Sequence, residues 1–345
     1  MTADGCRSLS ARGPAAAEGC GSALRQGKPW AGTVTGRPLR LRRAIHGAAS
    51  RLVAASALVL TSFGQAQSLE PRAYSPSPVG ANFALVSFAE SSGTVLLDSE
   101  APFDNVTAKL DASALGYGHT FSLLGRQALI SVAVPYIRGT LQGQVGESST
   151  SIQRSGMGNL QTRFSVNLLG SPALSPQAFA QEPARFILGT SLTVVAPTGQ
   201  YDPTRLINIG TNRWAYKAEL GISEPLRNLV LDCYAGVWWF TDNRSYYPGQ
   251  STRSQDPLAT LQAHLSYTFR PRLWLAVDTT WYGGGGSSVN HVPANDRQDN
   301  SRAGATLSLP LGRAQSLKSF FSTGVSARSG QDFTTWGVGY QVVWF

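Results

Sequence analysis

The feature that most constrains this chain is a repeated alternation of apolar and polar residues, which begins near Ser68 and continues to the C-terminus. Residues 261–269 (LQAHLSYTF) give the clearest case, with Leu261, Leu265 and Phe269 on one face and His264 on the other. A period of two residues is that of a β-strand, because successive side chains point to opposite faces. An all-β fold is therefore predicted for residues 68–345.

The alternating stretches predict twelve antiparallel strands, with ten or fourteen as the alternatives. The connections after even-numbered strands are mostly short, and those after odd-numbered strands are mostly long and polar. Short turns at one rim and long loops at the other are typical of a barrel that spans the bacterial outer membrane. The predicted strands begin near residues 80, 110, 126, 156, 185, 212, 229, 259, 272, 300, 316 and 332.

A soluble β-sandwich shows the same alternation, so composition decides between the two. Only 14% of the residues are charged, against roughly a quarter in a typical soluble domain. The sequence therefore predicts a transmembrane antiparallel β-barrel of the outer membrane, whose outer face contacts lipid. Aromatic residues near the predicted strand ends would form the interfacial girdles of such a barrel; they are Trp214, Trp239, Phe240, Phe269, Trp274, Trp281, Tyr282 and Trp344.

The N-terminal region is predicted to direct secretion. Residues 37–67 combine a basic patch, an apolar run from Leu52 to Leu60 and small residues around Ala66, as a secretory signal peptide does. Residues 1–36 form an extension without periodicity, which we expect either to be disordered or to lie upstream of the true start. Residues 1–66 carry most of the net charge of +9, so the basic balance gives no argument for nucleic acid as a partner. We expect the protein to lie in the outer membrane of a Gram-negative bacterium after cleavage of this signal peptide.

The chain ends on an apolar, strand-like run, TTWGVGYQVVWF. In a soluble protein this would be an exposed edge strand, which natural proteins usually avoid. We expect the last strand to pair with the first and close the barrel. The terminal aromatic resembles the signal that the outer-membrane assembly machinery reads. The apolar positions from Trp336 to Trp344 leave Phe345 one step outside the lipid-facing set.

Several longer stretches resemble a known family. They are APTGQYDPTRLINIGTNRWAYKAELGIS at 196–223, GMGNLQTRFSVNLLGSP at 156–172 and QDPLATLQAHLSYTFRPRLWLAVD at 255–278. The chain is similar here to the outer-membrane transporter family labelled MetA-pathway of phenol degradation. The resemblance implies a barrel and the uptake of aromatic or other hydrophobic compounds, and it brings no catalytic residues.

Six ionisable residues fall on the polar faces of their predicted strands. On the lipid face an Arg or Lys costs roughly 2–4 kcal/mol at mid-bilayer, so we expect these side chains to point into the lumen. They could line a selective pore, or neutralise each other and fill the lumen with salt bridges. The six are Arg163, Lys217, Glu219, Asp232, His264 and Asp278.

The segment PTGQYDP contains turn-forming residues in a predicted outer loop. Through Pro197, Gly199 and Tyr201 it could fold into the mouth of the barrel, or it could be the rigid tip of a hairpin. Asn212 and Arg213 stand at the entrance of the next strand, where Arg213 would reach the mouth.

An enzymatic function is a weaker alternative. His264 and Ser266 share a strand face and Asp278 lies on the next strand, so a hydrolase triad is conceivable. The glycine-rich stretch at 281–292 lacks the lysine of a phosphate-binding loop, and no His/Cys cluster has metal-ligand spacing. We therefore predict no enzyme, no cofactor and no metal.

The sequence as a whole predicts a channel for the passive uptake of small, aromatic or hydrophobic, solutes. Its expected partners are outer-membrane lipid, the outer-membrane assembly machinery and the small-molecule solute. The alternative is a plugged structural or ligand-binding barrel that acts through its extracellular loops.

Overall fold

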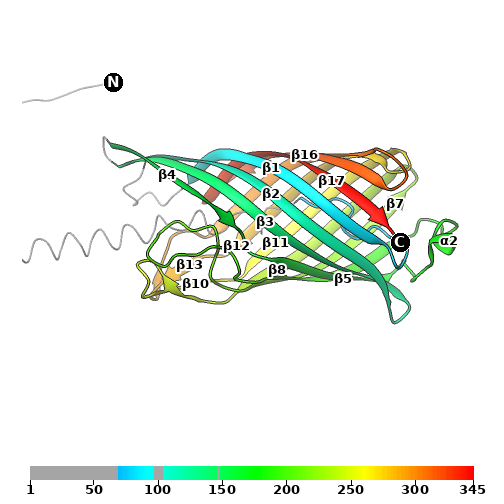
Figure 1. The fold of residues 1–345 in the computed structure, drawn as a ribbon, viewed down its shortest axis with the longest axis horizontal. Helices are drawn as coiled ribbons and strands as arrows, with labels where there is room; N and C mark the ends of the chain where they lie inside the picture. The colour runs from blue at the N-terminus through cyan, green and yellow to red at the C-terminus, as the bar shows by residue number, and fades with distance from the viewer. Residues whose placement is uncertain (1–68, 97–103, 146–147) are drawn as a thin grey trace, which may run out of the picture. The chain divides into compact units, whose positions relative to one another are not determined.

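The computed structural model describes residues 69–96, 104–145 and 148–345. The predicted signal peptide and the extension before it lie outside these residues. A closed antiparallel barrel is built by β1 (Asn82–Leu96), β2 (Asp104–Leu123), β3 (Arg126–Val145), β4 (Ser148–Met157) with β5 (Gln161–Leu169), β6 (Ile187–Val195), β7 (Ala215–Leu226), β8 (Leu229–Phe240), β11 (Leu258–Arg270), β12 (Leu273–Gly284), β15 (Gln298–Pro310), β16 (Gln315–Ser326) and β17 (Gly330–Trp344) (Figure 1).

The last strand closes the cylinder on the first. β17 pairs with β1 over its whole length, with Asn82 opposite Trp344 and Leu96 opposite Gly330. Because β4 and β5 are two pieces of one strand, the barrel has the twelve strands that the sequence predicts. Among the described residues, no helix is long and apolar enough to cross a membrane.

Burial within the barrel is the inverse of that in a soluble protein. On β11, Leu261 and Leu265 are 52% and 47% exposed, whereas His264 and Ser266 are 1% and 0% exposed. The apolar residues of the alternation therefore face outward and the polar residues face inward. An apolar outer wall matches the hydrocarbon of a bilayer, which confirms the predicted fold class.

The two rims differ as predicted. One rim carries the tight turns and the C-terminus, together with the short helix α2 (Pro176–Phe179) (Figure 1). The other rim carries the long loops, which contain a small second sheet. This sheet consists of β9 (Asn243–Tyr246), β10 (Ser251–Gln255), β13 (Ser287–Val289) and β14 (Val292–Pro293).

The largest difference from the prediction lies in the first four strands. β2 begins at Asp104 rather than near residue 110, and the fourth strand begins at Ser148 rather than near residue 156. Outward-facing charges occur here, and Lys109 pairs with Glu90 at 3.1 Å. Charges on the outer face are unfavourable in lipid, so these strands continue past the apolar part of the membrane.

The predicted aromatic girdle is wrong for three of its members. Trp274 and Tyr282 are buried inside the barrel, and Phe240 packs there beside Trp238. Trp274 and Tyr282 share the inward-facing positions of β12 with Asp278, so proximity to a strand end did not reveal their direction. The girdle residues that the structure exposes are Trp214, Trp239, Phe269, Trp281 and Trp344.

Candidate functional site

The segment that precedes β1 lies inside the barrel. The backbone nitrogen of Arg72 donates to Asp232 Oδ2 at 3.2 Å, and that of Ala73 donates to the Tyr234 hydroxyl at 3.0 Å. The Arg72 guanidinium stacks over Trp274, 4.7 Å from the ring centroid. We call residues 69–81 the lumen segment. These contacts fix its first part against the inner faces of β5 to β12, whereas its last residues bond to Thr120 of β2 and Gln127 of β3. This role is not visible in the sequence, because the segment has no periodicity.

Tyr74 is the anchor of the lumen segment. Its hydroxyl donates to Glu219 Oε1 at 3.0 Å and lies 3.1 Å from Ser191 Oγ. Its ring rests on Gly189 and Gly221, which lie opposite each other on β6 and β7. A Cβ atom at either glycine would come within 2.2 Å of the Tyr74 ring. The two glycines therefore form a flat contact surface for the Tyr74 ring, hereafter the glycine seat. Any other residue at these two positions would collide with the ring.

Glu219 is the centre of the charge network beside this seat. Arg163 Nη2 donates to its Oε1 at 3.3 Å, and Lys217 Nζ donates to its Oε2. Arg163 also pairs with Glu70 of the lumen segment at 2.9 Å. Since a buried charge is stable only when paired, the barrel wall and the lumen segment here depend on each other.

A second polar group lies on β8, β11 and β12. His264 stands opposite Asp232 on one side and Asp278 on the other, and its Nδ1 lies 2.7 Å from Asp278 Oδ1. Thr306 Oγ1 donates to Asp278 Oδ2 at 2.7 Å. Within the described part of the chain, Ser266 Oγ and His264 Nε2 make no hydrogen bond. The Ser–His contact of a hydrolase triad is therefore not formed here.

All six ionisable residues of the sequence prediction lie on the inner face of the barrel. The structure joins Arg163, Lys217 and Glu219 in one network and His264 with Asp278 in another, and Asp232 binds the lumen segment. That these six residues guide a solute through the barrel stays a prediction.

The five predicted mouth residues belong to the loop from 196 to 214, which is pinned to its neighbours. Gly199 donates its backbone N–H to Asn159 Oδ1 at 2.9 Å, and the Tyr201 hydroxyl donates to the backbone of Ser245 at 3.0 Å. Asn212 donates to Asn243 Oδ1 at 2.8 Å, and Pro197 is half-buried. The segment is thus fixed to the link between β4 and β5 and to the small sheet.

Arg213 is the most deeply buried of these mouth residues. It is 4% exposed, lies over the Phe240 ring at 4.4 Å and donates to Gln255. Burial lowers the pKa of its guanidinium well below the ordinary value. Arg213 therefore joins the loop to β8 and β10, whereas the sequence predicts only that it reaches the mouth.

The opposite side of the lumen is uncharged and largely apolar, with a few hydroxyl and amide side chains among its apolar residues (Ser87, Ser91, Ser131, Thr335 and Gln341). The strand register shows which residues of β2 and β3 face inward, because directly opposite residues of neighbouring strands share a face. Ser131 of β3 lies opposite Arg163, which faces the lumen, and Gly118 of β2 lies opposite Ser131. Within the described residues, the inner-facing positions of β1, β2, β3 and β17 carry no charge. This holds from Phe83 in β1, Val106 in β2, Gln127 in β3 and Gln331 in β17 to the end of each strand. We call this surface the apolar wall; it includes Leu85, Ala89, Leu110, Ala112, Ala114, Leu129, Ala133, Pro135, Ile137, Gly337 and Gly339.

A closed barrel with an apolar outside and a partly polar inside defines the class of transmembrane β-barrels of the outer-membrane type. The chain belongs to the family described as "Putative MetA-pathway of phenol degradation", whose model matches residues 87–341. No curated protein matches the chain.

Two solved structures are similar to this chain, and the first of them supports the fold. An outer membrane channel from Pseudomonas putida F1 is 20% identical, with a TM-score of 0.68 over 80% of this chain and 100% of the other. The β domain of the Bordetella autotransporter BrkA is 12% identical, with a TM-score of 0.47 over 77% and 100%. At these identities the likeness concerns the fold alone.

Proposed function

We propose that the protein is a passive outer-membrane channel for small apolar solutes, aromatic compounds among them, in a Gram-negative bacterium. The apolar wall is the observation that carries this proposal. A solute that moves along Ala112, Ala114 and Ala133 meets small side chains and no charge. Such a surface costs an apolar solute little, whereas a hydrophilic solute would lose hydrogen bonds with water and find only a few hydroxyl and amide groups to replace them.

The placement of the lumen segment supports the same route. The hydrogen bonds of Arg72, Ala73 and Tyr74 end on β5 to β11, on the polar side of the lumen. Residues 72–74 thus pair with the polar side, and residues 77–81 contact β2 and β3 only at the end of the apolar wall, through Thr120 and Gln127. The rest of this wall stays available to a solute. Membership of the family and the outer-membrane type of barrel support the location. Transport down a concentration gradient needs no energy source from this chain.

Influx of the apolar dye N-phenyl-1-naphthylamine into intact Gram-negative cells tests this proposal, because the lipopolysaccharide leaflet otherwise slows its entry. We expect cells that carry the barrel to take up the dye faster than cells with an empty vector. Ala114→Glu places a carboxylate on the apolar wall and should slow entry by about tenfold or more. Ala112→Ser, a change of one atom on the same wall, is the matched control. Equal influx with and without folded barrel would favour the plugged barrel that acts through its loops.

A further inference from the structure

The polarity of the first strands reverses where they leave the membrane. On the outward face of β1 to β3, apolar residues give way to Glu90, Lys109, Asp111 and Arg138. On the inward face of the same part, Val106, Ala108 and Leu110 are buried in a cluster with Val95 and Phe333. This outer part of β1 to β3, hereafter the strand extension, is thus built like a sheet of a soluble protein. Its apolar side continues the apolar wall toward the outside.

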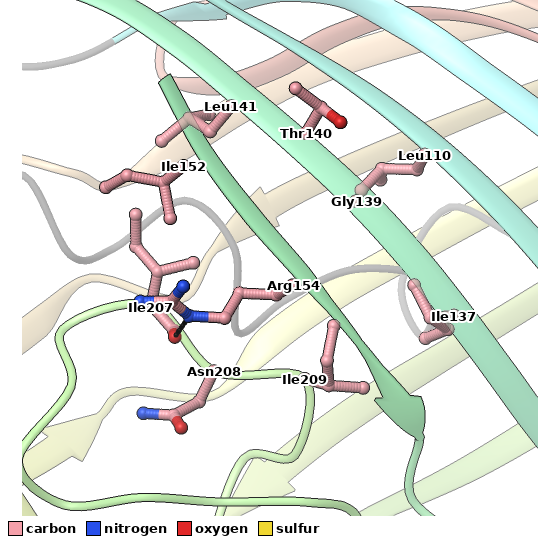
Figure 2. A pocket seen from close by; sticks show the side chains of 10 residues that line it. All are labelled: Leu110, Ile137, Gly139, Thr140, Leu141, Ile152, Arg154, Ile207, Asn208 and Ile209. Atoms are coloured by element: carbon pink, nitrogen blue, oxygen red, sulfur yellow. Dashed lines mark hydrogen bonds between the residues drawn. The ribbon is translucent and has the colours of Figure 1, made fainter. Parts of the chain in front are cut away.

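A hollow opens between this extension and the outer loop that contains residues 205–209. It is shallow, with a cavity volume of about 20 Å³, and its empty space reaches about 360 Å³ only where open solvent is included. Figure 2 shows strand side chains on one side and loop side chains on the other. Its apolar lining consists of Leu110, Ile137, Leu141, Ile152, Ile207 and Ile209.

One cation stands in this apolar lining. The Arg154 guanidinium, half-buried on β4, donates from Nε to the backbone oxygen of Ile207 at 3.2 Å and from Nη1 to that of Gln153 at 2.8 Å (Figure 2). Its Nη2 makes no hydrogen bond within the described ranges. Asp202 of the adjacent loop pairs with Arg205 at 2.9 Å, and its carboxylate also attracts Arg154 from a greater distance. Arg154 is therefore held in place with one donor edge left for a ligand.

We propose that this hollow binds an amphipathic carboxylate, with its apolar body against the isoleucines and its carboxylate on Arg154. A mostly apolar pocket with one fixed polar group is the usual design of a small-molecule site, and a guanidinium prefers a carboxylate. Leu110 and Ile137 also belong to the apolar wall, so the bound molecule lies at the outer end of the route. The inference rests on the proposed function and names a solute class for it.

Calorimetric titration of the protein in lipid nanodiscs, with empty nanodiscs subtracted, tests this site. The probes are 4-butylbenzoate and its uncharged isostere 4-butylbenzamide. We expect the benzoate to bind about 10- to 100-fold more tightly than the amide. Arg154→Gln keeps a donor for the Ile207 oxygen but removes the charge, so it should abolish this preference. Arg138→Gln makes the same change on the outward face of the same extension and should preserve it.

A second variant tests the apolar part of the site. Ile152→Trp fills the hollow and should weaken the binding of both probes. Equal binding of the two probes to the wild-type protein would overturn the inference, as would an equal loss in Arg138→Gln. If the probes bind equally but the apolar dye still enters cells, the site is wrong and the channel stands. If the benzoate binds selectively but the dye does not enter, the site stands and the channel is wrong.

Discussion

At the scale of single residues, Gly189 and Gly221 decide where the lumen segment rests. A Cβ atom at Gly221 would overlap the Tyr74 ring, so Gly221→Ala should displace Tyr74 and the segment with it. Overpacking of this kind costs about 1–3 kcal/mol. We expect a higher single-channel conductance in planar bilayers than for the wild-type protein. Gly312→Ala is the matched control, because nothing lies within 4 Å of its added Cβ. An unchanged conductance in folded Gly221→Ala would show that Tyr74 does not restrict the lumen.

Glu219 carries the second prediction at this scale. Glu219→Gln leaves Arg163 and Lys217 inside the barrel without their shared carboxylate, and loss of one partner of a buried ion pair costs roughly 3–5 kcal/mol. We expect lower resistance to denaturant and, in a salt gradient, a reversal potential shifted toward anion selectivity. Glu224→Gln, on the outward face of the same strand, should change neither. A reversal potential equal to that of the wild-type protein would show that the network does not face the ion path.

The direction of single side chains was predictable only in part. Alternation on β11 correctly separates Leu261 and Leu265 from His264, because a lipid-facing strand has one apolar side. Alternation could not assign Trp274, which is apolar yet faces the lumen and supports Arg72. The seat at Gly189 and Gly221 was also beyond sequence reasoning, since its meaning depends on a tyrosine more than 100 positions away along the chain.

At the scale of elements, the small outer sheet depends on Asp296, which accepts hydrogen bonds from the backbone N–H and the hydroxyl of Ser287 at 2.8 and 2.9 Å. Burial raises the pKa of the Asp296 carboxyl above its ordinary value. The folded loop therefore binds this proton more tightly than the unfolded loop. Its stabilising effect is greatest at low pH and declines as the pH rises above about 3.8.

Limited proteolysis of the outer loops at a series of pH values tests whether the loop becomes less stable as the pH rises. Cleavage near Asp296 should become faster as the pH rises from about 4 to 7, with the protease rate corrected on an unfolded substrate. Asp296→Asn should flatten this dependence, because the amide does not ionise. Asp242→Asn, at an exposed loop position, should retain it. Faster cleavage at the lower pH would contradict the assignment.

Elements were predicted well where lipid dictates the pattern. Strand starts at residues 126 and 229 match the sequence prediction, because a tight turn and a lipid-facing alternation coincide there. The prediction was poorest for the first residues of β2, for β4 and for the small outer sheet. These elements lie where the chain no longer meets lipid, so neither face has to be apolar and the period of two loses its meaning.

At the scale of the whole molecule, the barrel and the lumen segment are separable. The pairing of β1 with β17 closes the cylinder without any residue before Asn82. A chain that begins at residue 77 should therefore still fold and should show larger and steadier conductance steps than the full chain. The width of a twelve-stranded lumen lies between that of filled eight-stranded barrels and that of open sixteen-stranded porins.

A synthetic peptide of residues 69–76, added to the shortened barrel, completes this experiment. It should restore the smaller conductance, because the contacts of Tyr74 and Arg72 with the polar side of the lumen remain available. The same peptide with Tyr74→Ala lacks the group that occupies the glycine seat and should restore it poorly. Block by both peptides alike would mean that the segment acts by bulk alone. If the shortened barrel conducts no better than the full chain, the restriction lies in the outer loops, which Arg213 fixes to β8 and β10.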